Sequence, residues 1–225
     1  MKAMPPSSPL PSFDRLAGLY RWMEFATFGP WLGRCRSAYL GELAASRRAL
    51  ILGDGDGRFT ARLLAANQHV HLDAVDASPA MLAQLARRAD SHAARLRTYK
   101  ADARLWQPAN PPYDLIVTHF FLDCLTTEEV EALAAKLRAS VSPGALWVVS
   151  EFAIPTGRFG RWIAGPIVRA LYWAFGLLTG LTVRSLPSHR TALAHAGFTL
   201  GKRRSGLCGM LVSELWSWEE ISGGR

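Results

Sequence analysis

The sequence predicts an α/β fold with a doubly wound, mostly parallel seven-stranded sheet, a C-terminal antiparallel hairpin and a helical N-terminal lid. Three observations carry this prediction. Strand-like and helical segments alternate five times up to residue 152, which is the pattern of an open parallel sheet. A glycine-rich turn, residues 53–57, follows the first of these strands. Two last strand-like segments, 198–204 and 208–216, flank a turn at Ser205-Gly206 and predict a hairpin.

The predicted strands are short segments that are continuously apolar or alternate between apolar and polar residues. They span residues 49–52, 69–75, 96–100, 113–120 and 145–152. The run Leu115-Ile116-Val117 is typical of a strand that is buried on both faces. Pro143-Gly144 is expected to turn the chain into the last of the five strands.

The predicted helices have apolar residues at helical spacing and recognisable ends. A helical pattern from 13 to 43 breaks at Gly29-Pro30 and therefore predicts two helices. Another helix covers 59–66. Ser78-Pro79 is an N-cap followed by proline at the first helical position, and this helix ends before His92. Thr126 and Glu129 form a capping box for a helix that ends near Ser140.

The length and composition predict a single globular domain over residues 13–221. The chain has 225 residues, of which 49% are hydrophobic and 20% charged. Residues 1–12 are rich in Pro and Ser and are expected to form a disordered tail. Within the domain we expect four parts, which are a helical lid at 13–45, a cofactor-binding core at 48–152, an apolar cover at 153–192 and the terminal hairpin at 196–217.

Cysteine usage and charge limit the functional classes. Cys35, Cys124 and Cys208 lie far apart without a CxxC pair, so we expect neither a disulfide scaffold nor a metal site, and we expect a cytoplasmic location. The net charge is +8, but the basic residues are scattered, and the densest cluster is Lys202-Arg203-Arg204. No basic stripe with interleaved aromatic residues stands out, so we expect no nucleic-acid partner.

The spacing of the glycines distinguishes two kinds of nucleotide site. A dinucleotide-binding turn needs GxGxxG, but the third glycine position falls on Arg58 when counted from Gly53 and on Thr60 when counted from Gly55. The sequence has GxGxG instead, which favours a ligand without a pyrophosphate.

With this turn, residues 48–216 resemble the class I S-adenosylmethionine-dependent methyltransferases. The resemblance implies that Gly53, Gly55 and Gly57 pass under the methionine part of S-adenosyl-L-methionine. It further implies an acid at the end of the second strand that accepts hydrogen bonds from the ribose hydroxyls, and Asp76 stands there in the string Asp76-Ala77-Ser78-Pro79-Ala80-Met81-Leu82. Cofactor contacts are expected from Ala77, Met81 on the adenine face, Asp102 at the adenine amino group, Ala103 and His119.

One position departs from the family pattern. The family carries Asp or Glu two residues before the first glycine, where this chain has Ile51. That acid helps to hold the ammonium end of the cofactor. Asp54 or Asp56, both inside the loop, could stand in for it.

The residues after the fourth strand are the candidates for the reaction centre. His119 could act as a general base, and a structural histidine is an equal alternative. Asp123 is a second candidate base and has the alternative of capping the next helix. Phe120 and Phe121 are candidate substrate contacts. Tyr20 is another, because Phe13-Asp14-Arg15-Leu16-Ala17 and Tyr20 resemble the N-terminal lid of quinone-ring and other small-molecule C-methyltransferases.

These observations predict methyl transfer from S-adenosylmethionine to a small, apolar or aromatic molecule. The alternative is a non-catalytic protein that keeps the fold and binds the cofactor, a membrane surface or a partner. The apolar segment 158–184 motivates this alternative, because it could contact a membrane peripherally. Arg169 and Gly165-Pro166 lie inside the segment and argue against a spanning helix. The sequence does not predict the oligomeric state or the acceptor atom.

Overall fold

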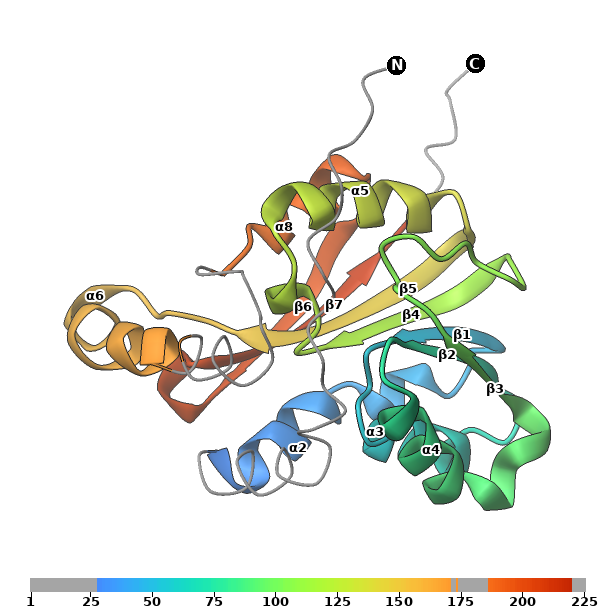
Figure 1. Cartoon of the computed structure of the whole chain (residues 1–225). Helices are drawn as coiled ribbons and strands as arrows, with labels where there is room; N and C mark the ends of the chain where they lie inside the picture. Colours follow the sequence, from blue (N-terminus) through green and yellow to red (C-terminus); the bar gives the residue numbers. More distant parts are fainter. Residues whose placement is uncertain (1–27, 171–172, 174–185, 220–225) are drawn as a thin grey trace, which may run out of the picture.

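A computed structural model describes residues 28–170, 173 and 186–219. Its centre is a seven-stranded sheet with the order β3-β2-β1-β4-β5-β7-β6 (Figure 1). Neighbouring strands among β1 to β5 are parallel, and β7 runs antiparallel to both β5 and β6, which confirms the predicted fold class. The strands are β1 Arg48–Leu52, β2 His71–Asp76, β3 Leu96–Lys100, β4 Tyr113–His119, β5 Val141–Phe152, β6 Thr199–Gly206 and β7 Leu211–Ser217.

Helices lie on both faces of the sheet (Figure 1). The α-helices are α2 Pro30–Arg36, α3 Arg58–Ala66, α4 Pro79–Arg88, α5 Thr127–Arg138, α6 Gly157–Phe159 and α8 His189–His195. The 3₁₀ turns are η1 Leu40–Leu43, η2 Asp90–Arg95, η3 Leu122–Cys124 and η5 Leu207–Gly209. After α6 the chain continues as a π-helical turn, η4 Gly160–Ala164, and as α-helix over 165–170.

Side-chain alternation along β1 shows how the sheet divides the core. Ala49 and Ile51 pack with the residues of η1, α3 and α4 on one face, whereas Leu50 and Leu52 pack with those of α5 and α8 on the other. All four side chains are at most 1% exposed. A strand that is buried on both faces needs a continuous apolar run. Residues 49–52 form such a run in β1.

Both predicted helix caps are present. The Ser78 hydroxyl accepts a hydrogen bond from the Met81 amide at 3.2 Å at the start of α4. Thr126 and Glu129 form the reciprocal capping box of α5. The cap of α4 fixes the residues at the end of β2, and the capping box of α5 fixes the residues that follow β4. Both groups lie at the edge of the sheet where the candidate site is found.

Several predicted boundaries are wrong by two to four residues. β2 begins at His71 and not at residue 69, because the Asn67 side chain accepts hydrogen bonds from the amides of residues 69 and 70 and holds them in a turn. β5 begins at Val141, ahead of Pro143-Gly144, because Val141 already pairs with Tyr113 across an irregularity in the ladder. α5 ends at Arg138, two residues before Ser140.

The hairpin turn also differs from the prediction. It comprises Leu207, Cys208 and Gly209, all with positive φ, and not Ser205-Gly206. Ser205 and Gly206 are the last paired residues of β6, opposite Val212 and Leu211. Two non-glycine residues with positive φ gave no turn signal in the sequence.

Part of the predicted lid and cover lies outside the described residues. This applies to the tail 1–12, to Phe13–Ala17 and Tyr20, and to most of 171–185. In the part of the lid that the structure describes, the break at Gly29-Pro30 is confirmed, because α2 begins at Pro30. Within 28–170, 173 and 186–219, no helix combines the length and the apolarity needed to cross a bilayer.

Candidate cofactor and substrate site

The predicted site residues gather at the carboxyl ends of β1, β2 and β4. β1 pairs with β2 on one side and with β4 on the other, so the order of the sheet reverses at β1. Ligands of open α/β sheets bind at such a point. The Gly53 amide donates to the Val75 carbonyl at 3.0 Å and thereby ties the start of the glycine loop to the end of β2.

The three loop glycines have positive φ and different surroundings. A Cβ on Gly53 would lie 2.4 Å from Cδ2 of Phe121, and a Cβ on Gly57 would lie 2.6 Å from Cα of Leu85 in α4. Gly53 and Gly57 therefore serve close packing within the chain. Among the residues that the structure describes, none would lie within 4 Å of a Cβ on Gly55, so the backbone at Gly55 has the space that a ligand-facing position requires.

The two loop aspartates are engaged differently. Oδ2 of Asp54 accepts from the Thr60 amide at 2.9 Å and from the Thr60 hydroxyl at 2.7 Å, which fixes the start of α3. Oδ1 of Asp54 is buried and has no hydrogen-bond partner among the described residues, and burial raises the pKa of this carboxyl to about 6. Oδ2 of Asp56 instead pairs with Arg58 at 2.8 Å and Arg88 at 3.0 Å. Of the two candidates for the role lost at Ile51, Asp54 therefore keeps a carboxylate oxygen with no partner.

The ribose candidate Asp76 ends β2 at the expected place. Its Oδ1 accepts from the Ser78 amide at 2.8 Å, which holds the carboxylate at the start of the turn that leads into α4. Its carbonyl accepts from the Ala101 amide at 3.1 Å, which joins it to the segment after β3. Ala77 lies between Asp76 and the cap, and the Met81 side chain is buried in the first turn of α4.

The adenine candidate Asp102 has a strong partner within the chain. Arg104 donates to both of its carboxylate oxygens, with three contacts between 2.8 and 3.1 Å. Arg104 also pairs with Glu129 of α5 at 2.7 Å. An adenine amino group would have to share Asp102 with Arg104, whereas the neighbouring Ala103 is a small buried residue on the same turn.

His119, the last residue of β4, is buried beside Phe59, with the two ring centroids 4.5 Å apart. Burial, with a smaller contribution from Arg36, holds the pKa of His119 well below its usual range, so the imidazole is neutral at pH 7. Neither ring nitrogen has a hydrogen-bond partner in the part of the chain that the structure describes. No hydrogen bond among the described residues therefore supports the alternative of a structural histidine.

Phe120 and Phe121 differ in their surroundings. Phe121 packs against Gly53 of the glycine loop. Phe120 has a positive φ and lies 4.9 Å from the ring of Phe152 at the end of β5, which in turn lies 5.2 Å from Phe28. An aromatic cluster therefore lies beyond the ends of β4 and β5.

Sequence reasoning missed a buried acid next to Asp123. Oε1 of Glu151, near the end of β5, accepts from the amides of Phe121 at 3.2 Å and Leu122 at 2.9 Å, whereas its buried Oε2 has no hydrogen-bond partner within the described part of the chain. Burial and the nearby carboxylate of Asp123 raise the pKa of Glu151 well above its usual range. Burial likewise raises the pKa of Asp123 to about 6. The available signal was an acid inside the predicted apolar strand 145–152.

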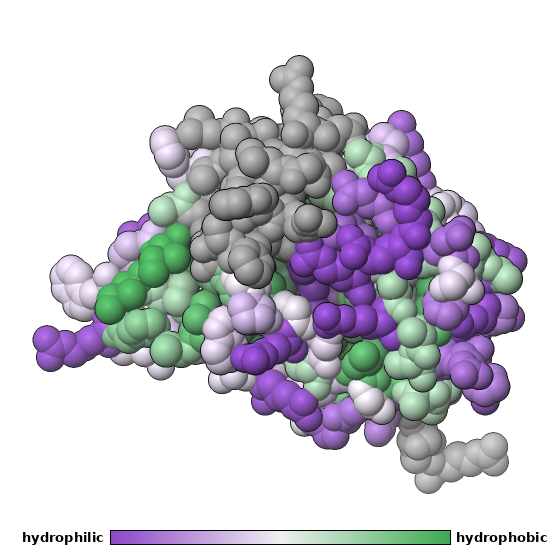
Figure 2. Space-filling view, turned by 90° about the horizontal axis from the view of Figure 1, so that it is seen from below, coloured by the Kyte–Doolittle hydropathy of each residue, from purple (hydrophilic) through white to green (hydrophobic). Residues whose placement is uncertain are grey.

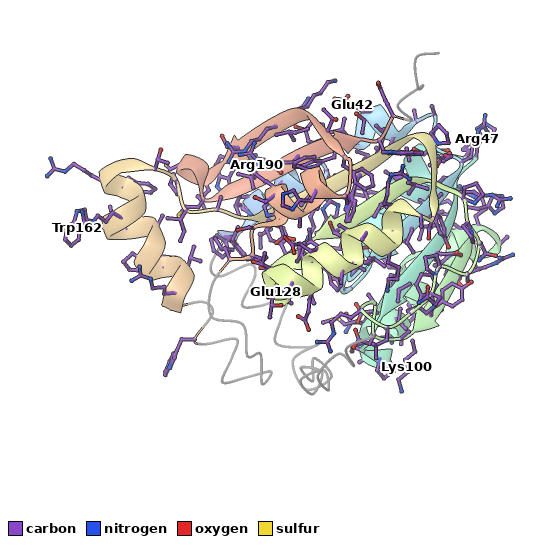
Figure 3. The ribbon with its side chains drawn as sticks, turned by 90° about the horizontal axis from the view of Figure 1, so that it is seen from above. Glu42, Arg47, Lys100, Glu128, Trp162 and Arg190 are labelled. Carbon is purple, nitrogen blue, oxygen red and sulfur yellow. The ribbon has the colours of Figure 1, made fainter. Side chains whose placement is uncertain are left out.

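A second polar group lies on α8 and β7. The carboxylate of Glu214 is fully buried and contacts Nε2 of His189 at 3.3 Å, Arg190 at 3.4 Å and Arg203 at 3.2 Å. Arg190 is labelled in Figure 3 near the β6–β7 hairpin. These contacts balance the charge of Glu214 within the chain, and they hold α8 against the sheet.

The chain is similar to methyltransferases in part of its sequence and in its fold. Residues 50–147 match the model of a methyltransferase domain family. No curated protein matches the chain in sequence. Solved structures with 16–21% identity share the fold.

Three of these structures illustrate the range. An O-methyltransferase family protein from Burkholderia thailandensis has a TM-score of 0.69 at 16% identity, over 92% of this chain and 61% of that one. The N-methyltransferase NodS from Bradyrhizobium japonicum WM9, in complex with S-adenosyl-L-homocysteine, has a TM-score of 0.64 at 17% identity, over 91% and 99%. The S-adenosylmethionine-dependent methyltransferase SibL has a TM-score of 0.65 at 21% identity, over 96% of this chain and 64% of that one. The chain thus spans about three-fifths of the Burkholderia structure.

Proposed function

We propose that this chain transfers a methyl group from S-adenosylmethionine to a small, apolar or aromatic acceptor, because residues 50–147 match a methyltransferase domain family and the chain shares the fold of S-adenosylmethionine-dependent methyltransferases. The observation that carries the proposal is the pairing of two features on neighbouring strands. The backbone at Gly55, after the end of β1, has no described residue within 4 Å of a Cβ placed on it, and the carboxylate of Asp76 is held at the end of β2. A ligand with a sulfonium arm and a ribose requires both.

The cofactor-binding roles follow from these positions. Asp76 accepts hydrogen bonds from the ribose hydroxyls, and the backbone of Gly53–Gly57 underlies the methionine part. Met81 and Ala103 provide apolar contacts to the adenine. Asp102 acts indirectly in this assignment, because its carboxylate already anchors Arg104 and thereby shapes the turn that carries Ala103.

The reaction centre lies beyond the end of β4. S-adenosylmethionine supplies a methyl group on a positively charged sulfur, which a nucleophile attacks in line. Phe120 and Phe121 exclude water from this space and contact an apolar or aromatic acceptor. Where the acceptor must lose a proton, Asp123 takes it, because a carboxyl whose pKa is about 6 is ionised at neutral pH and is a stronger base than an exposed one. Glu151 holds the turn of Asp123 through its bonds to the amides of residues 121 and 122.

Isothermal titration calorimetry with S-adenosylhomocysteine tests the cofactor half of the proposal. We expect Asp76→Ala to weaken binding by about 10- to 100-fold, since each hydrogen bond to a charged group contributes about 1.5–3 kcal/mol. Asp90→Ala is the matched control, because Asp90 is an exposed aspartate on η2. Equal affinities for the two variants would refute the ribose assignment.

A panel of phenols, indoles and aromatic amines, assayed with S-adenosylmethionine for methylated products by mass spectrometry, tests the catalytic half. We expect turnover on at least one member, and we expect Asp123→Asn to lower kcat while the affinity for S-adenosylhomocysteine stays unchanged. Cofactor binding without turnover on any compound would favour the alternative of a non-catalytic protein that keeps the fold.

A further inference from the structure

One helical segment stands away from the rest of the molecule. The projecting segment, residues 157–170, comprises α6, η4 and the helical turn 165–170, and Figure 1 shows it extending beyond the end of the sheet. One face of it is anchored. Three residues spaced four apart are buried, which are Gly160, Ala164 and Val168. Of these, Ala164 and Val168 pack with Met210 and Leu211 at the β6–β7 hairpin.

The exposed surface of the projecting segment is apolar as well. Phe159 is 37% exposed, Trp162 68%, Ile163 50% and Ile167 40%. Figure 3 shows Trp162 pointing away from the body of the protein. A surface helix of a globular protein carries polar residues on its solvent face, whereas here large apolar side chains occupy it. Such a patch indicates an interaction site.

The polar residues on this exposed face are basic. Arg158, Arg161 and Arg169 are all exposed, and the Arg161 guanidinium lies 5.3 Å from the centroid of the Trp162 ring. Figure 2 shows strongly hydrophobic surface beside hydrophilic atoms at this end of the molecule. The wider sequence has the same sign, because residues 152–213 contain eight Lys and Arg and no Asp or Glu. The basic residues themselves remain scattered along the chain, and Arg190 and Arg203 pair with Glu214, so the charge that this face offers to an anionic partner is that of Arg158, Arg161 and Arg169.

We propose that the projecting segment binds the surface of an anionic lipid bilayer. Trp162, Ile163 and Ile167 enter the boundary between headgroups and acyl chains, where Trp is favoured, and the arginines contact lipid phosphates. The charge decides against a second copy of the chain as the occupant, since two such faces would place arginines against arginines with no acid in the segment to pair with them. The proposal does not depend on methyl transfer.

Vesicle flotation with the full chain tests the apolar half. Vesicles of phosphatidylcholine alone are compared with vesicles that also contain phosphatidylglycerol. We expect the wild type to float with the anionic vesicles and Ile163→Glu to lower the bound fraction by about tenfold or more, because a carboxylate at this depth opposes both burial and the lipid charge. Leu105→Glu is the matched control, since Leu105 is an exposed aliphatic residue (58%, against 50% for Ile163) that lies outside the projecting segment, on the turn after β3.

Charge is tested with a second matched pair. We expect Arg158→Gln/Arg161→Gln to lower binding to the anionic vesicles by about tenfold, and Arg47→Gln/Arg48→Gln to leave it close to wild type, although both variants remove two exposed positive charges. Thermal unfolding of each variant checks that the fold is kept.

Three results would overturn the proposal. The first is a wild type that does not float with anionic vesicles. The second is equal binding by Ile163→Glu and Leu105→Glu. The third is a dimer in size-exclusion chromatography that Ile163→Glu converts to a monomer while vesicle binding stays unchanged, which would assign the exposed face to a second copy.

Discussion

At the scale of single residues, the buried carboxyl of Asp123 links the candidate chemistry to stability. Its pKa of about 6 lies above the ordinary 3.8, so the folded state binds more protons than the unfolded state between these values. The stability that Asp123 contributes therefore falls as the pH rises through this window, and the loss is complete above pH 6. At one pKa unit per 1.36 kcal/mol, the shift corresponds to about 3 kcal/mol at neutral pH.

We accordingly expect Asp123→Asn to raise the free energy of unfolding by about 3 kcal/mol at about pH 7.5 and by only about 1 kcal/mol at about pH 4.5. Urea unfolding at the two pH values measures both gains. The exposed Asp90→Asn serves as the control and should show no such difference. A gain at Asp123 that is the same at both pH values would contradict the burial of an ionisable carboxyl there.

The same scale shows where sequence reasoning ended. The position of Asp76 at the end of β2 could be predicted, because a strand pattern followed by Ser-Pro identifies the end of the strand. The partners of the acids could not. Asp102 pairs with Arg104 and Asp56 with Arg88, and these contacts depend on side-chain directions that a sequence pattern does not contain. Glu151 was overlooked because it lies within a run of apolar residues.

At the scale of an element, the glycine loop combines close packing within the chain at Gly57 with a backbone that faces the ligand space at Gly55. Substitutions at the two positions can separate these requirements. Gly57→Ala would combine a positive φ with a Cβ 2.6 Å from the Leu85 backbone, and we expect it to destabilise the protein by about 3 kcal/mol. Gly55→Ala meets open space and should cost only about 1 kcal/mol of backbone strain.

Gly55→Ala, which should cost little stability, should have a larger effect on ligand binding. We expect Gly55→Ala to weaken S-adenosylhomocysteine binding about tenfold in calorimetry, because its methyl group would occupy space beside the loop that the ligand needs. Urea unfolding supplies the stability half of the comparison. A Gly55→Ala variant that binds as tightly as the wild type would show that the open space is not used by the cofactor.

Elements were predictable in kind and less so in extent. The βα alternation predicted β1 to β5, the hairpin pattern predicted β6 and β7, and the two caps predicted the starts of α4 and α5. The boundaries failed where backbone geometry overrides residue preference, as at the turn Leu207–Gly209, where two residues other than glycine adopt positive φ. The π-helical turn η4 is a further case, since no residue pattern predicted it.

At the scale of the whole molecule, the sheet order assembles the cofactor site from segments that are distant in the sequence. Gly53–Gly57 follows β1, Asp76 ends β2 and His119 ends β4, and these strands are neighbours only in the folded sheet. Charge is distributed on the same scale, because residues 152–213 hold the excess of positive charge and include the projecting segment. The proposed cofactor site and the proposed membrane contact therefore lie in different parts of the chain.

This separation yields a prediction about the folded molecule as a whole. A ligand that binds only the assembled site stabilises the native state, by about 2.7 kcal/mol at a concentration of 100 times its Kd. For a chain of 225 residues this corresponds to an increase in Tm of about 5–10 °C. Differential scanning fluorimetry with S-adenosylhomocysteine should show this increase for the wild type and for Ile163→Glu, and Asp76→Ala, with binding weakened about 10- to 100-fold, should lose about half or more of it at the same concentration. If Ile163→Glu also lost the increase, the projecting segment would contribute to cofactor binding, and the two parts would not be independent.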